Sequence, residues 1–317
     1  MSIPQVDLQP WFHGSARDRS AVASQVDRAL QESGFLLVSG HGVDPELPRA
    51  TRAAARRFFA LPKALKQSYE TTVGGRGWQP PGVEANGASE GLKTPPDLKE
   101  SYSSGSEGSG PHDADPFWHP QNVWPGEVPE IRTTFSAYTD AMRRLSDELL
   151  MLFAAALELE PDHFTRHTRR PKFTLNVNRY PSLNETGAPQ EGQFRIGPHT
   201  DFGTLTVLDR EPGVGGLQVS GDDGGWVDAP YEEGALTVNI GDMMARWTGD
   251  RWRSARHRVL PPHASAPDED LVSLVYFYVT DMEARIASLP EPVGVRGYPE
   301  VGAVDYLREK LASITVS

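Results

Sequence analysis

Apolar residues in the first half of the chain recur mainly at helical spacing. Across residues 18–33 they repeat every three to four positions, which predicts an amphipathic helix that ends at Gly34. Residues 71–125 are instead rich in Gly, Ser and Pro and lack apolar periodicity, so we expect a long loop there. The regular elements predicted in this half are helices over 18–33, 45–60 and 127–159 and strands over 3–8 and 35–38.

The second half of the chain alternates between apolar and polar residues in short runs, which is typical of strands. The stretch 197–208 belongs to this pattern, because Leu205 and Val207 alternate with polar neighbours. Short strands separated by turn residues favour an antiparallel barrel or a double-sheet jelly roll. The strands predicted here are 173–180, 197–208, 216–219, 225–228, 236–242, 257–260 and 271–279, followed by a helix over 304–314.

Together these elements predict an α+β, mainly β fold in which a helical first half packs on a jelly-roll core. With 317 residues, no internal repeat and no evident linker, we expect a single domain over 1–317. Its predicted portions are a mainly helical part (1–165), the jelly-roll core (172–281) and a C-terminal segment with a helix (282–317).

Composition narrows the classes of function. The net charge of −12 argues against nucleic acid as a partner, because phosphate binding needs a basic surface. No apolar run is long enough to span a membrane, and the first residues do not form a signal-peptide pattern. The chain has no Cys, which removes disulfides and thiolate metal sites and is compatible with the cytoplasm. We therefore expect a cytoplasmic protein whose partner is neither nucleic acid nor a membrane, and we predict no oligomeric state.

The strongest candidate chemistry lies in the stretch 197–208. In an extended strand His199 and Asp201 project from the same face, so an imidazole and a carboxylate are directed at one point. A further histidine, His257, opens a later predicted strand. Two histidines and one carboxylate with open coordination positions are the ligand set of non-haem Fe(II) oxygenases. Catalytic zinc is a chemical alternative, whereas structural zinc would require four protein ligands, usually including Cys.

Several motifs, in order along nearly the whole chain, resemble the isopenicillin N synthase-like branch of the 2-oxoglutarate/Fe(II)-dependent dioxygenases. The resemblance implies a double-stranded β-helix core with iron held by His199, Asp201 and His257. It also implies decarboxylation of 2-oxoglutarate by O2, coupled to hydroxylation, desaturation or cyclisation of a small molecule. The matching segments are Gly34-Phe35 through Val43, Asp97-Leu98-Lys99-Glu100, Asn178-Arg179-Tyr180-Pro181, Gly197-Pro198-His199-Thr200-Asp201, Gly216-Leu217-Gln218-Val219 with Trp226, Val238-Asn239-Ile240-Gly241-Asp242 and Arg253 to Val259.

For the co-substrate the resemblance implies three matching residues, Asn178, Tyr180 and Ser273, and one departure. The family binds the far carboxylate of 2-oxoglutarate with an Arg two residues before the Ser, and this chain has Leu271 there. A carboxylate that enters a low-dielectric barrel without a cation is penalised by several kcal/mol. Either Arg195 or Lys172 substitutes as the cation, or the co-substrate is bound differently or is another oxo acid, or no oxo acid is used, as in isopenicillin N synthase.

Two further expectations concern the substrate and the class of protein. The loops 71–125 and 182–193 and the C-terminal helix are natural lid elements. A non-catalytic binding protein on the same fold is the alternative that Leu271 keeps open. The residues we expect to line a substrate pocket are Arg76, Trp78, Tyr102, Phe202, Tyr276 and Tyr278.

Overall fold

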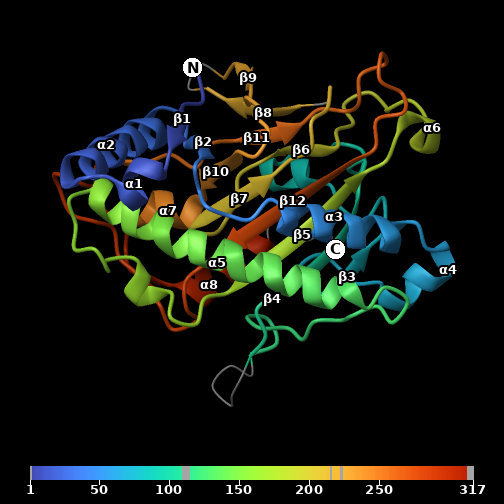
Figure 1. Ribbon diagram of the computed structural model, residues 1–317, viewed down its shortest axis with the longest axis horizontal. Coiled ribbons are helices and arrows are strands. Elements are labelled where there is room, and N and C mark those ends of the chain that lie inside the picture. Colours follow the sequence, from blue (N-terminus) through green and yellow to red (C-terminus); the bar gives the residue numbers. More distant parts are fainter. Residues whose placement is uncertain (1, 109–114, 215, 222–223, 313–317) are drawn as a thin grey trace.

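A sheet of eight strands forms the centre of the molecule and faces a smaller sheet of four strands (Figure 1). The larger sheet has the order β1-β2-β10-β7-β12-β5-β4-β3, and its only parallel pair in the described part is β1 with β2. The smaller sheet has the order β6-β11-β8-β9. This computed structural model describes residues 2–108, 115–214, 216–221 and 224–312.

The strands are β1 (Gln5–Asp7), β2 (Phe35–Ser39), β3 (Gly77–Gln79), β4 (Glu100–Gly105), β5 (Phe173–Tyr180), β6 (Ile196–His199), β7 (Leu205–Asp209), β8 (Leu217–Ser220), β9 (Trp226–Asp228), β10 (Leu236–Ile240), β11 (His257–Val259), β12 (Leu271–Tyr278), β13 (Arg285–Ile286) and β14 (Val301–Gly302). The last two pair in a separate ribbon. The helices are α1 (Gln9–His13), α2 (Ala16–Glu32), α3 (Glu46–Phe59), α4 (Lys63–Lys66), α5 (Glu130–Ala156), α6 (Leu183–Thr186), α7 (Asp242–Trp247) and α8 (Ala303–Ala312), with 3-10 turns at Gln67–Tyr69, Asn86–Glu90 and Thr165–His167.

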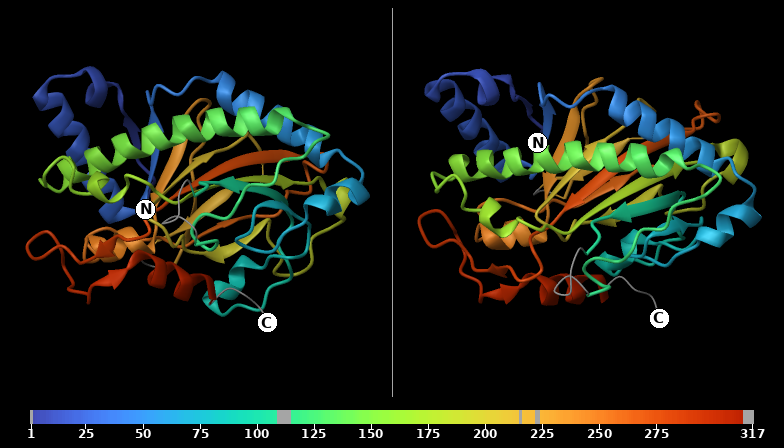
Figure 2. Two further views of the ribbon diagram at one scale, coloured as in Figure 1. Left: turned by 90° about the horizontal axis from the view of Figure 1, so that it is seen from below. Right: turned by 60° about the horizontal axis from the view of Figure 1, so that its bottom comes forward.

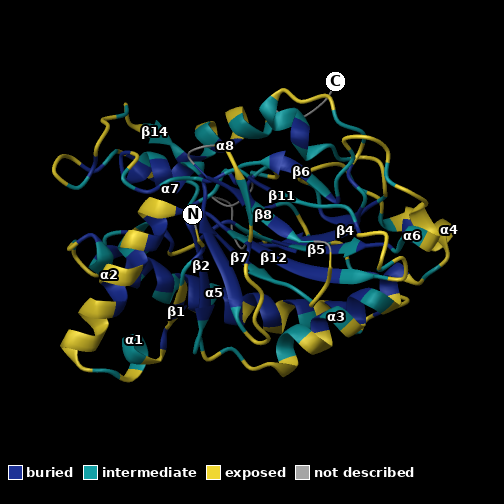
Figure 3. Cartoon of the chain, turned by 90° about the horizontal axis from the view of Figure 1, so that it is seen from above, coloured by how far each residue is buried: buried dark blue, intermediate teal, exposed yellow. Residues whose placement is uncertain are grey.

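Helices α3 and α5 lie along one face of the large sheet, and the small sheet lies on the other face (Figure 2). Successive side chains of a strand point to opposite faces of the sheet, so each strand has one face toward the helices and one toward the small sheet. In β5, Leu175 and Val177 project into the main hydrophobic core beneath these helices, whereas Asn178 and Tyr180 project into the space between the sheets. Figure 3 shows the strands buried and the outer faces of the helices exposed. The interior of the roll holds only a small apolar cluster, which leaves room there for polar side chains.

Two predicted elements differ from the structure. The expected loop 71–125 contains β3 and β4, which extend the large sheet beyond β5. Its segment 109–114 lies outside the described residues, as do the last two residues of the helix predicted over 304–314. The expected strand 197–208 is two strands, because β6 ends at His199 in the small sheet and β7 begins at Leu205 in the large one. The chain therefore crosses between the sheets at Asp201.

Candidate active site

Three side chains meet where the small sheet faces the large one. His199 ends β6 and His257 begins β11, and the two residues are direct partners in the antiparallel pairing. Asp201 lies in the crossing between β6 and β7, and its Oδ1 is 3.8 Å from His199 Nε2 and 3.7 Å from His257 Nε2. One donor atom from each residue lies within 4.8 Å of the others, the only such group among the described residues. The spacing suits one metal ion bound on three sides.

Both imidazoles are held in the same orientation by their own backbone. His199 Nδ1 lies 2.8 Å from the carbonyl oxygen of Gly197, and His257 Nδ1 lies 3.2 Å from that of Ala255. In each case the carbonyl belongs to the residue two positions earlier. An Nδ1–H that donates to a carbonyl fixes the tautomer in which Nε2 is the free donor for a metal. Both Nε2 atoms face Asp201.

The carboxylate of Asp201 is fixed through its other oxygen. Asp201 Oδ2 accepts hydrogen bonds from Thr206 Oγ1 at 2.6 Å and from Asn239 Nδ2 at 2.7 Å. These donors come from β7 and β10, which pair with each other in register Thr206 to Asn239. The large sheet therefore orients Oδ1 toward the two histidines of the small sheet.

Thr206→Val is expected to weaken Fe(II) binding by roughly 10- to 100-fold without changing the ligand set. The methyl group keeps the volume but removes one donor to Asp201 Oδ2, and such supporting hydrogen bonds usually contribute this much to metal affinity. Calorimetric titration of the metal-free protein with Fe(II) under anaerobic conditions measures the effect. Thr237→Val, on β10 but outside the contacts of Asp201, is the control. Equal weakening in both variants would contradict the role given to Thr206.

Backbone contacts clamp the crossing that carries Asp201. The amide of Asp242 donates to the carbonyl of Asp201 at 2.7 Å, and that of Met243 donates to the carbonyl of Phe202 at 3.2 Å. A Cβ on Gly241 would lie 2.4 Å from the carbonyl oxygen of Gly203, so no other residue fits there without displacing the crossing. The Asn239-to-Asp242 motif thus positions Asp201 through both a side chain and the backbone.

Burial and mutual interaction set the protonation of the three side chains. Burial, reinforced by His199, lowers the pKa of His257 to about 4. Burial by itself would raise the pKa of Asp201, but the facing imidazoles and the two hydrogen bonds to Oδ2 outweigh it and lower the pKa. At neutral pH the site therefore presents a neutral His257 imidazole and an ionised carboxylate, the forms that bind a divalent cation.

A cavity of about 420 Å³ opens from these three residues toward the surface. Its buried part contains Phe35, Leu217 and Ala229, and its more exposed part carries polar residues. Its lining also includes Asn178, Tyr180, Arg195, Leu271 and Ser273, all predicted to lie near the co-substrate. The polar residues toward the surface are Arg210, Glu211, Gln218, Asp228 and Tyr231.

The chain matches the family model described as the 2OG-Fe(II) oxygenase superfamily over residues 172–280. Residues 3–127 match the model described as the non-haem dioxygenase in morphine synthesis N-terminal region. The validamycin A dioxygenase of Streptomyces hygroscopicus subsp. limoneus is 43% identical over 98% of this chain and 86% of its own length. The 2-oxoglutarate-dependent dioxygenase citB of Monascus ruber is 32% identical over 90% of this chain and 87% of its own.

The chain belongs to the 2-oxoglutarate/Fe(II)-dependent dioxygenases.

Solved structures agree with this assignment. A 2OG-Fe(II) oxygenase family protein from Caulobacter crescentus superposes with a TM-score of 0.85 at 27% identity, covering 99% of both chains. A full-length Neurospora crassa protein in complex with alpha-KG and thymine gives a TM-score of 0.84 at 25% identity, covering 99% of this chain and 97% of its own. The predicted jelly-roll fold, enzyme class and cofactors, Fe(II) and 2-oxoglutarate, are confirmed.

The residues predicted to bind the co-substrate of this dioxygenase lie together in the cavity. Strands β5 and β12 pair in a register that places Asn178 opposite Ser273 and Tyr180 opposite Leu271. Leu271 therefore stands beside Tyr180, where the family has its Arg. Lys172, the second predicted substitute, lies at the opposite end of β5, and its Nζ donates to the carbonyls of Phe117 and Trp118. Lys172 therefore lies outside the cavity that contains the residues predicted to bind the co-substrate.

The six residues expected to line a substrate pocket do not line this cavity. Tyr276 and Tyr278 lie on the face of β12 that is turned away from the cavity. Ser273, Val275 and Phe277 face the cavity, whereas the even-numbered residues of β12 face the helices. The remaining four also have other partners: Arg76 donates to Phe173 and Thr174, Trp78 Nε1 to Glu100, Tyr102 packs on Phe58, and Phe202 lies beside Lys310.

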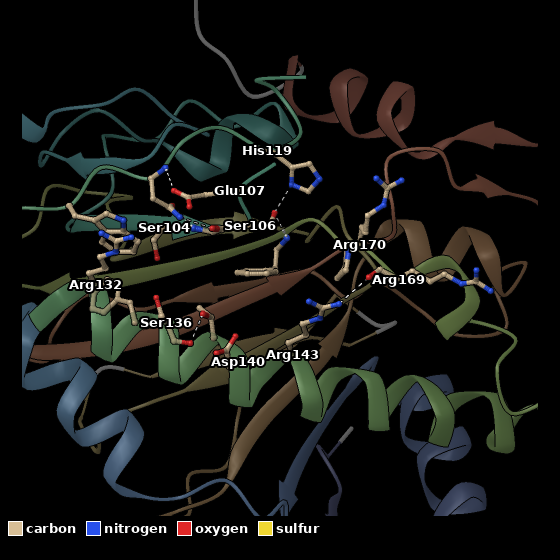
Figure 4. A pocket seen from close by; sticks show the side chains of 17 residues that line it. Ser104, Ser106, Glu107, His119, Arg132, Ser136, Asp140, Arg143, Arg169 and Arg170 are labelled. Atoms are coloured by element: carbon tan, nitrogen blue, oxygen red, sulfur yellow. Dashed lines mark hydrogen bonds between the residues drawn. The ribbon is translucent and has the colours of Figure 1, made fainter. Parts of the chain in front are cut away.

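A second hollow of about 350 Å³ lies at the far end of β4 and β5 against α5 (Figure 4). It is open and carries the side chains of Arg132, Arg143, Arg169 and Arg170 together with Asp140. The group of residues that could hold a metal lies in the other cavity, so we expect the active site of the dioxygenase there and not in the hollow beside α5. No helix in the described ranges is both long and apolar enough to cross a membrane.

Several residues of the site escaped the sequence analysis. Thr206 and Asn239 orient Asp201 through hydrogen bonds, and Glu269 pairs with Arg195. Asn239 belongs to a recognised motif and pairs with β7, so it could have been found had the strand register been known. Arg210 and Tyr231 lie outside regular strands, and no periodic signal marks them.

Proposed function

We propose that His199 Nε2, Asp201 Oδ1 and His257 Nε2 bind the Fe(II) of this dioxygenase, leaving the other coordination positions to 2-oxoglutarate and O2. The observation that carries the proposal is the convergence of these three donor atoms at the base of the cavity, each fixed by a hydrogen bond on its other side. Bound iron and 2-oxoglutarate supply the activation of O2. The chain supplies ligand geometry, a shielded base and the orientation of the substrate.

The substrate that the cavity supports best is a small polar molecule. Arg210, Gln218, Asp228 and Tyr231 surround the more exposed part and offer both donors and acceptors. The apolar side chains of the buried part would exclude water from the C–H bond to be oxidised. The relative that is 43% identical is named a validamycin A dioxygenase, which makes validamycin A the first substrate to test.

Incubation with Fe(II), 2-oxoglutarate, O2 and validamycin A is expected to give a product heavier by one oxygen atom, with one succinate formed per product. Mass spectrometry and succinate quantification measure this, and thymine serves as a comparison substrate because the Neurospora crassa protein was solved with it. Oxidation of thymine but not validamycin A would contradict the proposed substrate class. Succinate formation without oxidation of validamycin A or thymine would also contradict the proposed substrate class. In that case, loss of Fe(II) binding in His257→Ala would still support the proposed metal ligands.

The proposal extends to the organisation and location of the protein. One hydrophobic cluster joins residues from β1 to α8, which supports a single domain over 1–317. The absence of Cys is compatible with the proposed cytoplasmic location, and the net charge of −12 supports a partner other than nucleic acid.

A further inference from the structure

Arg195 is a fully buried cation in the wall of the active-site cavity. It comes directly before β6, the strand that carries His199, and its backbone amide donates to the carbonyl of Val259 at 3.0 Å. Its guanidinium lies 5.5 Å from the ring of Tyr180. Tyr180 in turn stands opposite Leu271 in the strand pairing. Arg195, which precedes a strand of the small sheet, therefore places a positive charge near Tyr180 and Leu271 of the large sheet. Leu271 is the position at which the family has its arginine.

The hydrogen bonds of Arg195 leave one edge of its guanidinium free. Nη1 donates to Glu269 Oε1 at 2.7 Å, whereas Nε and Nη2 are buried without a hydrogen-bond partner among the described residues. In the planar guanidinium these two nitrogens share one edge, and their N–H bonds point in parallel. This edge is the one that binds a carboxylate through two hydrogen bonds. Because buried donors without partners are costly, the free edge indicates a missing anionic ligand.

The groups around the free edge suit the far end of an oxo acid. Asn178 and Ser273 lie close to the hydroxyl of Tyr180. Burial raises the pKa of Tyr180, while Lys99, Asn178, Arg195 and Ser273 oppose that rise, so this phenol stays protonated at neutral pH and is available as a donor. A carboxylate there would meet a cation and several neutral donors. This replaces much of the hydration that it loses on entering the cavity.

The other cationic side chains near Tyr180 and the cavity interact with other groups. Lys99 Nζ is paired with Glu84 and bonded to Ser101 Oγ. Arg210 donates to the carbonyl of Pro230 and lies over the ring of Tyr231, in the more exposed part of the cavity. Among the residues that the structure describes, Arg195 is the cation that is both fully buried and has two donors without a hydrogen-bond partner.

We propose that Arg195 binds the far carboxylate of 2-oxoglutarate through Nε and Nη2, in place of the arginine that Leu271 has replaced, and that Glu269 holds Arg195 in position. The proposal rests on the assignment of iron to His199, Asp201 and His257, because the keto-acid end must reach that metal. Leu271 fits this arrangement sterically: its Cδ1 lies 2.5 Å from where a Cβ on Gly213 would stand, so the glycine leaves it space.

Binding of two oxo acids to Arg195→Gln tests the proposal directly. Anaerobic calorimetry with Fe(II) compares 2-oxoglutarate with 2-oxobutyrate, which has the keto-acid end but no far carboxylate. Arg195→Gln is expected to weaken 2-oxoglutarate by at least about 100-fold and to leave 2-oxobutyrate within about threefold, since only the first loses a bidentate charged contact. Equal weakening of both acids, or of neither, would overturn the proposal.

Further variants separate this proposal from the metal assignment and from misfolding. Fe(II) affinity and the circular dichroism spectrum of Arg195→Gln should match the wild type, because the substitution leaves the metal ligands unchanged. The double variant Arg195→Leu/Leu271→Arg is expected to recover 2-oxoglutarate affinity by at least tenfold over Arg195→Leu. Arg210→Gln supplies the competing outcome: if it, and not Arg195→Gln, removes the preference for 2-oxoglutarate, the anchor is Arg210 and the proposal is wrong.

Discussion

Asp201→Ala is expected to lose at least 100-fold in Fe(II) affinity and to form no succinate above the metal-free background. Asp201 is the one anionic side chain of the proposed ligand set, and it is 6% exposed. Its removal leaves only the imidazole nitrogens as donors, which carry no negative charge to offset that of a divalent ion, and leaves Thr206 and Asn239 without their acceptor. Anaerobic calorimetry with Fe(II) measures the first effect and a coupled succinate assay the second.

Asp162→Ala is the matched control for Asp201→Ala. Asp162 is an exposed carboxylate whose contact with Arg166 is 3.9 Å, so wild-type metal affinity and turnover are expected. Tight Fe(II) binding by Asp201→Ala at wild-type stoichiometry would refute the ligand assignment.

Glu100→Ala is expected to lower the free energy of unfolding by about 3–5 kcal/mol, because it breaks a buried ionic network. Glu100 is 2% exposed and joins three elements. Its Oε2 accepts from Lys66 Nζ and Trp78 Nε1, both at 2.7 Å, and its Oε1 accepts from Arg179 Nη1 at 2.8 Å. Removal of the carboxylate leaves the buried Lys66 ammonium without its counter-charge. Guanidinium chloride unfolding followed by circular dichroism measures the loss.

The control for Glu100→Ala is Glu46→Ala. Glu46 pairs with Arg49 on the surface of α3, where both side chains are at least 65% exposed, and a change below about 0.5 kcal/mol is expected. Similar losses in the two variants would mean that the Glu100 network contributes no more than a surface ion pair. Glu100→Gln, which keeps the volume and one acceptor, should fall between them.

Hydrophobic patterning predicted those parts of the fold in which one face is apolar. The helix α5 and the strands β5 and β12 follow the predicted ranges closely, because their apolar residues face the core between sheet and helices. Strand β4 was missed because its sequence, ESYSSG, has few apolar residues. Ser101 and Ser103 face Asn178 and Asn176 in the polar interior, so the usual contrast between the two faces is lost.

The three candidate metal ligands were predictable as a set of residues but not as a geometry, and the residues expected around the substrate lie outside the cavity. His199 and Asp201 were expected on one continuous strand, yet the chain leaves the small sheet at His199 and crosses to the large one. Convergence with His257 depends on the pairing of β6 with β11, which connects distant parts of the chain. Sequence periodicity carries no information on such pairing. The sequence analysis also placed Tyr276 at the cavity, although the role it expected for Ser273 puts the odd-numbered residues of β12 there and Tyr276 on the opposite face.

The position of Arg210 and Tyr231 outside the regular strands has a consequence for how this enzyme can change. Two of the residues that would meet the substrate, Arg210 and Tyr231, belong to segments between strands, whereas Asp201 and its supports are fixed by sheet hydrogen bonds and by the close contact of Gly241 with Gly203. Substitutions at positions 210 and 231 can therefore alter substrate preference while the iron site keeps its geometry. Libraries that vary these two positions offer a route to new substrates with the oxidative chemistry retained.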